Sequence, residues 1–284
     1  MEIQYVTVIG SGTMGRGIAY VAAAAGFDTT VTDVSEDILE RGRQAVGDLL
    51  AKAVDRGRIE REAAEEAFGR IRWLVDLEAA AREANLIVEA IPEDLELKKD
   101  LLSQVDLFCA EDTILATNTS SMSITQLAGA VERREKFIGL HFFNPVPAMK
   151  LVEIVLGERT GAETVDTCRE VVRRMGKEPI VIRDSPGFAS SRLGVALGLE
   201  AIRMVEEGVG SPADIDRAME LGYNHPMGPL RLTDLVGLDV RLRIAEYLAL
   251  RLGPRFEPPA LLRKMVAEGK LGKKSGEGFY AWEE

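Results

Sequence analysis

The glycine pattern GSGTMG at residues 10–15 constrains the fold of this chain more than any other feature. It comes directly after the apolar run Tyr5–Ile9 and opens a helical stretch, which is the strand–turn–helix setting of a dinucleotide-binding loop. Gly10 allows a tight turn, Gly12 lets the backbone approach a pyrophosphate, and Gly15 allows close packing of helix on strand. The predicted cofactor contacts of this loop are Gly10, Gly12, Thr13, Met14 and Gly15. The alternative is a structural glycine turn without a ligand.

An acidic residue follows this loop at about the spacing that a ribose-binding acid requires. Asp33 comes at the end of the second strand-like run, close to the roughly 20 residues expected between the glycine loop and such an acid. The next four residues, 34–37, contain no Arg or Lys that would hold a 2′-phosphate. The sequence therefore predicts NAD rather than NADP as the cofactor.

Short β-branched runs alternate with helical stretches up to about residue 183, which is typical of βαβ units on a largely parallel sheet. The expected strands are Tyr5–Ile9, Thr29–Asp33, Ile71–Val75, Leu86–Ile91, Thr113–Thr117, Phe137–Phe143, Leu151–Leu156 and Pro179–Arg183. The expected helices are Thr13–Ala25, Glu36–Arg56, Leu95–Cys109 and Val165–Met175. The strands are apolar at both alternating positions, as expected when helices cover both faces of the sheet.

The pattern changes at the segment DSPG, residues 184–187, after which only helical stretches follow. These are Phe188–Glu207, Ser211–Leu221, Pro229–Leu252 and Pro259–Glu268, with a capping box at Ser211 and a stop at Gly222. We predict an α/β protein with a Rossmann-type doubly wound N-terminal domain, residues 1–185, and a smaller all-helical C-terminal domain, residues 186–284.

Composition excludes several classes of protein. The net charge of −11 disfavours nucleic-acid binding, and no uncharged apolar run is long enough for a membrane span. We see no signal peptide at the start of the sequence. The two cysteines, Cys109 and Cys168, rule out a disulfide framework and favour a cytoplasmic location.

One of only two histidines ends an apolar strand, where active sites of open α/β sheets lie. His141 is therefore a better candidate for a general base than His225, which lies in a turn-like segment between helices. Glu153 lies inside the apolar run Leu151–Leu156, where a carboxylate is costly unless paired. Such a carboxylate can orient the imidazole and stabilise its protonated form. The alternative is a structural histidine and a strand-edge glutamate.

The run HFFNPVP at residues 141–147, with MKLVE at 149–153, resembles the signature of the L-3-hydroxyacyl-CoA dehydrogenase family, of the 3-hydroxybutyryl-CoA dehydrogenase type. Further motifs match: VEAIPE at 88–93, NTSS at 118–121, DSPGF at 184–188, HPMGP at 225–229 and GEGFY at 276–280. The resemblance covers nearly the whole chain.

The resemblance implies roles for individual residues. It makes His141 and Glu153 the proton-transferring pair, and it makes Ser120 a contact of both nicotinamide and substrate oxygen. Ser121 can instead cap a helix over 123–128. It further implies that Asn144 contacts cofactor or substrate. The remaining implied NAD contacts are Glu93, Lys98 and Lys274; for Lys98 the alternative is a solvated helix face.

Coenzyme A requires cations for its phosphates. The family carries coenzyme A contacts at the helix that corresponds to Glu36–Arg56, which indicates Lys52 and Arg56; surface charges at a helix C-terminus are the alternative. The chain departs from the family at Ser191, where an asparagine usually lies near the substrate. Serine still donates and accepts a hydrogen bond but reaches less far.

The resemblance implies an NAD-dependent enzyme that oxidises a short-chain (S)-3-hydroxyacyl-CoA, with no metal and no nucleic-acid or membrane partner. It also implies a homodimer formed through the C-terminal domain. A dehydrogenase of a free hydroxy acid or a sugar acid of the L-gulonate type is the first alternative. A non-catalytic NAD-binding protein, like the lens crystallins of this family, is the second. The presence of His141, Glu153 and Ser120 argues against the latter.

Overall fold

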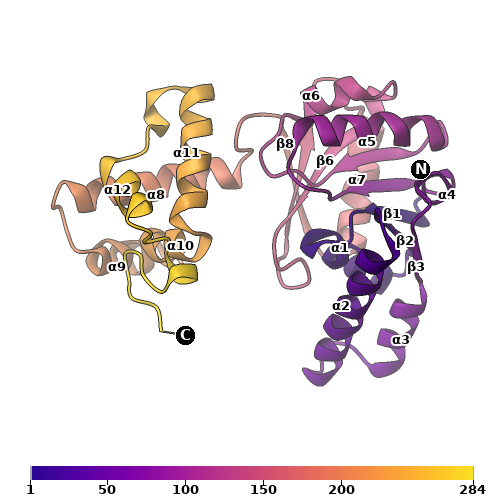
Figure 1. The fold of residues 1–284 in the computed structure, drawn as a ribbon, viewed down its shortest axis with the longest axis horizontal. Helices are drawn as coiled ribbons and strands as arrows, with labels where there is room; N and C mark the ends of the chain where they lie inside the picture. The colour runs from indigo at the N-terminus through magenta and orange to yellow at the C-terminus, as the bar shows by residue number, and fades with distance from the viewer. Residues whose placement is uncertain (1, 284) are drawn as a thin grey trace. The chain divides into compact units, whose positions relative to one another are not determined.

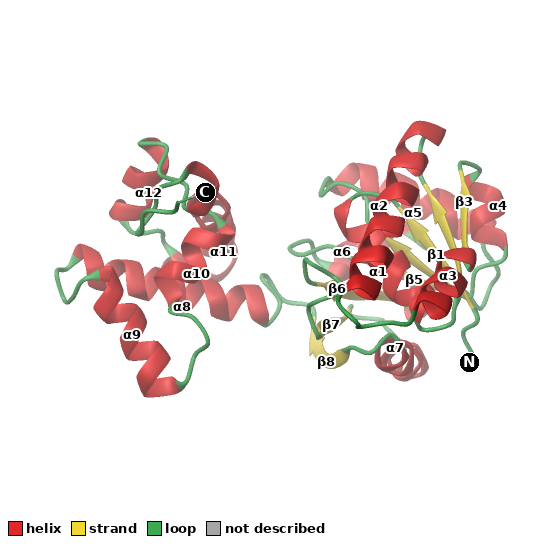
Figure 2. Cartoon of the chain, turned by 90° about the horizontal axis from the view of Figure 1, so that it is seen from below, coloured by secondary structure: helices red, strands yellow, loops and turns green. Residues whose placement is uncertain are grey.

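A computed structural model describes residues 2–283, and the chain divides into two units, Met1–Ser185 and Pro186–Glu284. The first unit is built on one eight-stranded sheet (Figures 1 and 2). Its strands are β1 (Tyr5–Ile9), β2 (Asp28–Thr32), β3 (Ile71–Leu74), β4 (Leu86–Glu89), β5 (Ile114–Thr117), β6 (Phe137–Phe142), β7 (Leu151–Leu156) and β8 (Glu178–Arg183). All eight expected strands are present; β1 and β7 have the predicted ends, and the ends of the others differ by at most two residues.

The strand order is β3-β2-β1-β4-β5-β6-β7-β8, and every pair is parallel except the antiparallel pair β6 and β7. The order reverses between β1 and β4, which is the switch point where doubly wound sheets bind ligands at the strand carboxyl ends. The predicted fold class is confirmed. Every residue of β4, β5 and β6 is buried, because these strands lie in the interior of the sheet.

Helices cover both faces of the sheet; Figure 1 shows α1 and α2 on one side and α5 and α6 on the other. The helices of this unit are α1 (Thr13–Ala24), α2 (Glu36–Asp55), α3 (Arg61–Gly69), α4 (Leu77–Arg82), α5 (Leu95–Phe108), α6 (Ile124–Leu127) and α7 (Ala162–Arg174). One apolar core joins β-strand residues with α1, α2, α3 and α7. Helices α3 and α4 were absent from the sequence prediction, because each is short, at 9 and 6 residues.

The second unit is helical, as predicted, around a core of its own. Its helices are α8 (Ser190–Glu206), α9 (Pro212–Tyr223), α10 (Pro229–Val236), α11 (Leu238–Leu252) and α12 (Ala260–Ala267). The capping box at Ser211 is confirmed, since its side chain accepts a hydrogen bond from the Asp214 N–H at 3.2 Å. No described helix of either unit is both long and apolar enough to cross a membrane.

Two predicted helix limits in this unit were wrong. The stretch Pro229–Leu252 is two helices, because Gly237 adopts φ +100° and breaks the helix there. Helix α9 does not stop at Gly222 but continues to Tyr223, and Asn224 ends it in the left-handed conformation at φ +56°. Asparagine tolerates that conformation and competes with glycine at helix ends.

Candidate active site

The glycine loop has the shape that a dinucleotide requires. Gly10 adopts φ +99°, and a Cβ on it would lie 2.8 Å from the Ala90 carbonyl oxygen. A Cβ on Gly15 would lie 1.7 Å from the Gly10 carbonyl oxygen, so only glycine fits there. At Gly12, by contrast, a Cβ would meet no atom within 4 Å, which leaves open space in front of the N-terminus of α1. The free N–H groups of that helix end suit a pyrophosphate, so this loop fits NAD.

Asp33 directly follows β2 and is held against the glycine loop. Its Oδ2 accepts hydrogen bonds from the Ser11 N–H at 2.7 Å and the Ser11 hydroxyl at 2.9 Å. Its Oδ1 accepts the Val34 N–H at 2.8 Å. These bonds fix the carboxylate beside the loop, at the position where the acid of such folds meets the ribose diol.

His141 and Glu153 lie directly opposite each other on the antiparallel strands β6 and β7. The Nδ1–H of His141 donates to Glu153 Oε2 at 2.7 Å, since a carboxylate can only accept. His141 is 6 % exposed and Glu153 is completely buried, so the strand-edge alternative for Glu153 was wrong. With its proton on Nδ1, the imidazole carries its basic lone pair on Nε2.

A cleft of about 370 Å³ collects six of the predicted site residues at the carboxyl ends of the parallel strands. These are Met14, Glu93, Lys98, Ser120, His141 and Asn144. The Phe143 ring packs on the His141 ring, with centroids 4.4 Å apart. A proton-accepting histidine, a serine hydroxyl and an asparagine amide therefore share one cavity next to the glycine loop.

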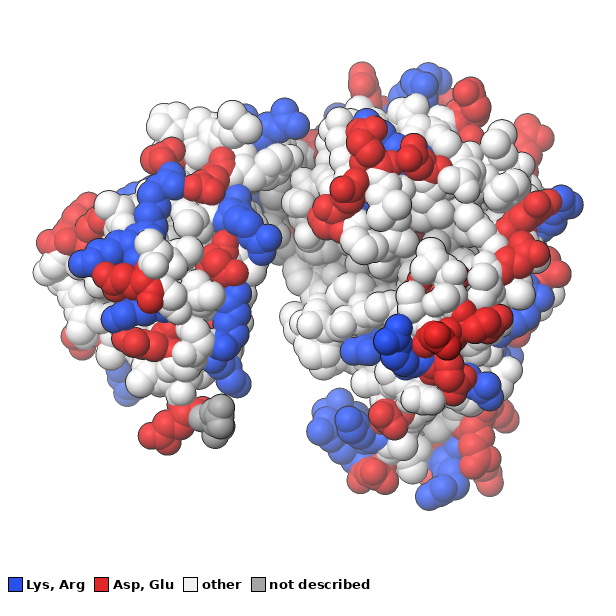
Figure 3. Space-filling view, in the orientation of Figure 1, with Lys and Arg blue, Asp and Glu red and all other residues white. Residues whose placement is uncertain are grey.

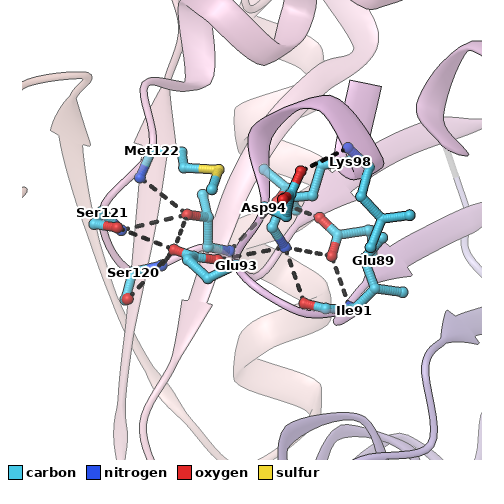
Figure 4. Close-up of polar contacts among 11 residues, drawn as sticks. Glu89, Ile91, Glu93, Asp94, Lys98, Ser120, Ser121 and Met122 are labelled. Atoms are coloured by element: carbon cyan, nitrogen blue, oxygen red, sulfur yellow. Dashed lines mark hydrogen bonds and ion pairs between the residues drawn. The ribbon is translucent and has the colours of Figure 1, made fainter. Parts of the chain in front are cut away.

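Glu93 holds the segment that carries Ser120. Its Oε1 accepts the Ser120 N–H at 3.0 Å and the Ser121 hydroxyl at 3.1 Å, besides the Thr119 hydroxyl (Figure 4). Burial raises the pKa of Glu93, but the hydrogen bond from Thr119, the charge of Lys98 and the bonds from Ser120 and Ser121 outweigh it. The net pKa lies below the ordinary value, so Glu93 is ionised at neutral pH.

Two alternatives from the sequence are wrong. Lys98 does not lie on a solvated face, because it is completely buried and its Nζ lies 2.5 Å from Glu89 Oε1. Ser121 does not cap a helix; Ser123 caps α6 by accepting the Gln126 N–H at 3.1 Å.

Sequence reasoning assigned no role to two polar residues of this region, Glu89 and Asn118. The Asn118 Oδ1 accepts the Phe142 N–H at 2.9 Å, which links the end of β6 to the Ser120 segment. Glu89 is completely buried at the end of β4. A carboxylate in an otherwise apolar strand was the signal that identified Glu153, and it applies equally to Glu89.

The predicted coenzyme A contacts, Lys52 and Arg56, do not line this cleft. They are exposed at the carboxyl end of α2, where Figure 3 shows basic side chains gathered among acidic ones. Ser191 and Lys274 belong to the helical unit. Ser191 is half-buried in the first turn of α8.

Lys274 lies on a C-terminal segment that is held in place by the buried Asp234. Asp234 accepts the Phe279 N–H at 2.9 Å, the Tyr280 N–H at 3.0 Å and the Trp282 indole N–H at 2.9 Å. The Lys274 ammonium lies 2.5 Å from Asp239 and lowers the pKa of that carboxyl. This anchoring gives a physical reason for the GEGFY motif, since a Cβ on Gly278 would lie 2.3 Å from Asp234.

Comparison with known proteins agrees with this geometry. Residues 5–185 match the family "3-hydroxyacyl-CoA dehydrogenase, NAD binding domain", and residues 187–282 match "3-hydroxyacyl-CoA dehydrogenase, C-terminal domain". A probable 3-hydroxybutyryl-CoA dehydrogenase of Deinococcus radiodurans is 47% identical over 276 residues, which cover 97% of this chain and 99% of that protein. The mitochondrial hydroxyacyl-coenzyme A dehydrogenase of Homo sapiens is 42% identical over 287 residues, which cover 99% and 91%.

Among solved structures, the crystal structure of (S)-3-hydroxybutyryl-CoA dehydrogenase from Ralstonia eutropha superposes with a TM-score of 0.96. The two sequences are 37% identical, and the match covers 100% of both chains. The resemblance inferred from the sequence motifs is thereby confirmed.

Proposed function

Because the chain belongs to the 3-hydroxyacyl-CoA dehydrogenase family, it is an NAD-dependent oxidoreductase, and we propose that His141 and Glu153 carry its chemistry on a short-chain (S)-3-hydroxyacyl-CoA. The product is the 3-ketoacyl-CoA. The observation that carries this proposal is the buried His141–Glu153 pair at the cleft that also contains Ser120 and Asn144.

Each residue of the cleft has a separate role in the reaction. NAD held by the glycine loop and Asp33 would supply the hydride acceptor for C3 of the substrate. His141 Nε2 takes the proton of the 3-hydroxyl as the C3–O bond becomes a carbonyl, and Glu153 supplies the counter-charge for the imidazolium that forms. The Ser120 hydroxyl donates a hydrogen bond to the substrate oxygen. In the reverse direction, the imidazolium returns its proton to the alkoxide.

The test is NADH oxidation with acetoacetyl-CoA, longer 3-ketoacyl-CoAs and free acetoacetate, and, in the opposite direction, NAD reduction with a short (S)-3-hydroxyacyl-CoA and with a free hydroxy sugar acid. We expect kcat/KM to be highest with a short 3-ketoacyl-CoA. Turnover of free acetoacetate or of the sugar acid at equal efficiency would instead make this a free hydroxy-acid dehydrogenase.

The glycine loop and its acid are proposed to hold NAD, through Gly10, Gly12, Thr13, Met14, Gly15 and Asp33, with Glu93, Lys98, Asn144 and Lys274 as further contacts. Asp33 repels a 2′-phosphate, so kcat/KM with NADH should exceed that with NADPH by roughly 10²-fold or more. Asp33→Ala should narrow this gap by at least tenfold without abolishing turnover. Asp37→Ala, which removes an exposed carboxylate from the first turn of α2, is the control and should leave the gap unchanged. If kcat/KM with NADH still exceeds kcat/KM with NADPH as strongly in Asp33→Ala as in the parent, a residue other than Asp33 excludes the 2′-phosphate.

Coenzyme A is proposed to contact Lys52 and Arg56, whose positive charges suit its 3′-phosphate. Arg56→Ala should then raise KM for acetoacetyl-CoA several-fold, with little change in KM for the matching pantetheine thioester, which lacks that phosphate. Arg41→Ala removes an exposed charge from the same helix and should change neither value. If Arg56→Ala raises KM equally for both substrates, Arg56 does not bind the 3′-phosphate.

Ser191 is proposed to keep the substrate-facing role of the usual asparagine.

A homodimer formed through the helical unit is the proposed assembly. Several large apolar side chains of this unit are more than half exposed: Leu193, Val209, Leu221, Tyr223 and Leu250. Apolar side chains exposed in such numbers favour an interface with a second copy. Sedimentation at micromolar concentration should give about twice the chain mass of 31.0 kDa, and a single-chain mass at every concentration would contradict the proposal.

The proposed compartment is the reducing cytoplasm. Both cysteines, Cys109 and Cys168, are free and buried, so no disulfide supports the fold.

A further inference from the structure

A buried lysine lies between two carboxylates at the end of β4 (Figure 4). Lys98 Nζ is 2.5 Å from Glu89 Oε1 and 3.4 Å from Glu93 Oε2, and it donates to the Ile91 carbonyl at 3.2 Å. Neither Glu89 nor Lys98 is exposed at all, whereas the Glu93 side chain is 37% exposed. An isolated charge in such a place is strongly unfavourable, so Glu89 and Lys98 each depend on the other.

Glu89 also joins three segments that approach the cleft. Its Oε1 accepts the Ile91 N–H at 2.7 Å, and its Oε2 accepts the Thr117 hydroxyl at 2.6 Å. These donors come from the β4–α5 loop and the end of β5, and Lys98 comes from α5. Glu93 on that loop then holds Ser120 by its N–H. A continuous path of polar contacts therefore runs from Glu89 through Lys98 and Glu93 to Ser120.

The four residues differ in access to the cleft. Glu93, Lys98 and Ser120 line it together with His141, but Glu89 does not. Glu89 can therefore act on a bound cofactor only through the residues that it holds and through its charge. Two carboxylates and one ammonium give this cluster one net negative charge, wherever the shared proton lies between Glu89 and Lys98.

We propose that Glu89 is a positioning residue which fixes Lys98, Glu93 and the Ser120 segment, and whose charge makes the cleft favour oxidised over reduced cofactor. This inference rests on the proposed function, in which the nicotinamide lies near Ser120 and His141. The oxidised nicotinamide ring carries a positive charge and the reduced ring carries none. A net negative cluster beside the ring therefore stabilises NAD relative to NADH.

The test measures Kd for NAD and for NADH without substrate, by calorimetry and by NADH fluorescence. Glu89→Gln keeps the size of the side chain but makes the cluster neutral, so Kd(NAD)/Kd(NADH) should rise by roughly fivefold. The kcat should fall as well, because Lys98 and Glu93 lose their fixed arrangement. Glu96→Gln removes an exposed carboxylate from the same helix α5 and should leave the ratio unchanged.

A double variant separates charge from position. Glu89→Gln with Lys98→Met removes the ion pair but leaves Glu93 charged, so the cluster again carries one negative charge. The Kd ratio should return to the parent value while kcat stays low. Glu93→Gln, which neutralises the cluster at another residue, should raise the ratio as Glu89→Gln does. This variant keeps the test open if Glu89→Gln does not fold.

A ratio that stays within twofold of the parent value in both Glu89→Gln and Glu93→Gln would overturn the proposal. So would a double variant whose ratio equals that of Glu89→Gln, because Glu89 would then act by packing alone. The binding measurements need no acyl-CoA. Failure of the proposed function would appear separately, as parent enzyme that binds NAD but does not turn over acetoacetyl-CoA.

Discussion

Replacing His141 by alanine should lower kcat by roughly 10²–10⁴-fold, the range expected when a general acid–base group is lost. This corresponds to about 3–5.5 kcal/mol of transition-state stabilisation. The variant should still fold and bind NADH, because the imidazole contributes proton transfer and the glycine loop contributes the cofactor contacts. Steady-state kinetics with acetoacetyl-CoA, together with an isotope effect from C4-deuterated NADH, would show whether the chemical step limits turnover.

The second histidine provides a matched control. His225 lies in the segment between α9 and α10 of the helical unit, and His225→Ala should leave kcat within about twofold of the parent value. A His141→Ala enzyme with near-native kcat, under conditions where hydride transfer limits the rate, would remove His141 from the mechanism.

Replacing Glu153 by glutamine should lower kcat by roughly 10–10³-fold. Glutamine can keep a hydrogen bond to His141 Nδ1, but it supplies no negative charge for the imidazolium in a completely buried position. The effect should therefore fall on kcat more than on the Kd of NADH. Stopped-flow measurement of a single turnover isolates the chemical step from product release.

Glu158→Gln is the matched control for this substitution, because Glu158 is an exposed glutamate just beyond the end of β7. It should leave the single-turnover rate unchanged. If Glu153→Gln reacts as fast as the parent in a single turnover, the carboxylate serves only to pack the sheet.

The chain sequence by itself determined the fold class and most of the elements. Eight apolar runs at strand length, separated by helical stretches, predict a covered parallel sheet, and all eight are strands. Burial on both faces holds for the inner strands β4, β5 and β6, whereas the edge strands β3 and β8 are largely exposed or half-buried. The glycines at 10, 12 and 15 predict their turn because their roles are local: a positive φ at Gly10, an open face at Gly12 and close packing at Gly15. Other local motifs, such as HFFNPVP at residues 141–147, identified the family.

The contact between His141 and Glu153 depends on the alignment of two strands. Glu153 was singled out as a carboxylate in an apolar strand, but its partner depends on the register of β6 and β7, which places it directly opposite His141. The side-chain period of a strand is two, so a slip of one residue would point Glu153 to the other face of the sheet. The sequence predicts the two residue types, and the antiparallel register makes them a pair.

Only the tertiary structure shows that the Lys98 side chain is buried and not solvated. Its neighbours in the sequence are charged, and a lysine on a helix is usually solvated. Here α5 packs so that Lys98 is buried against Glu89 from β4, and neither charge could be buried without the other. The break at Gly237 was also missing from the sequence prediction, because the helical pattern continues through it, whereas in the structure Gly237 adopts φ +100° between α10 and α11. Local sequence sets which elements form; the buried charges and bends depend on partners that only the folded chain brings within reach.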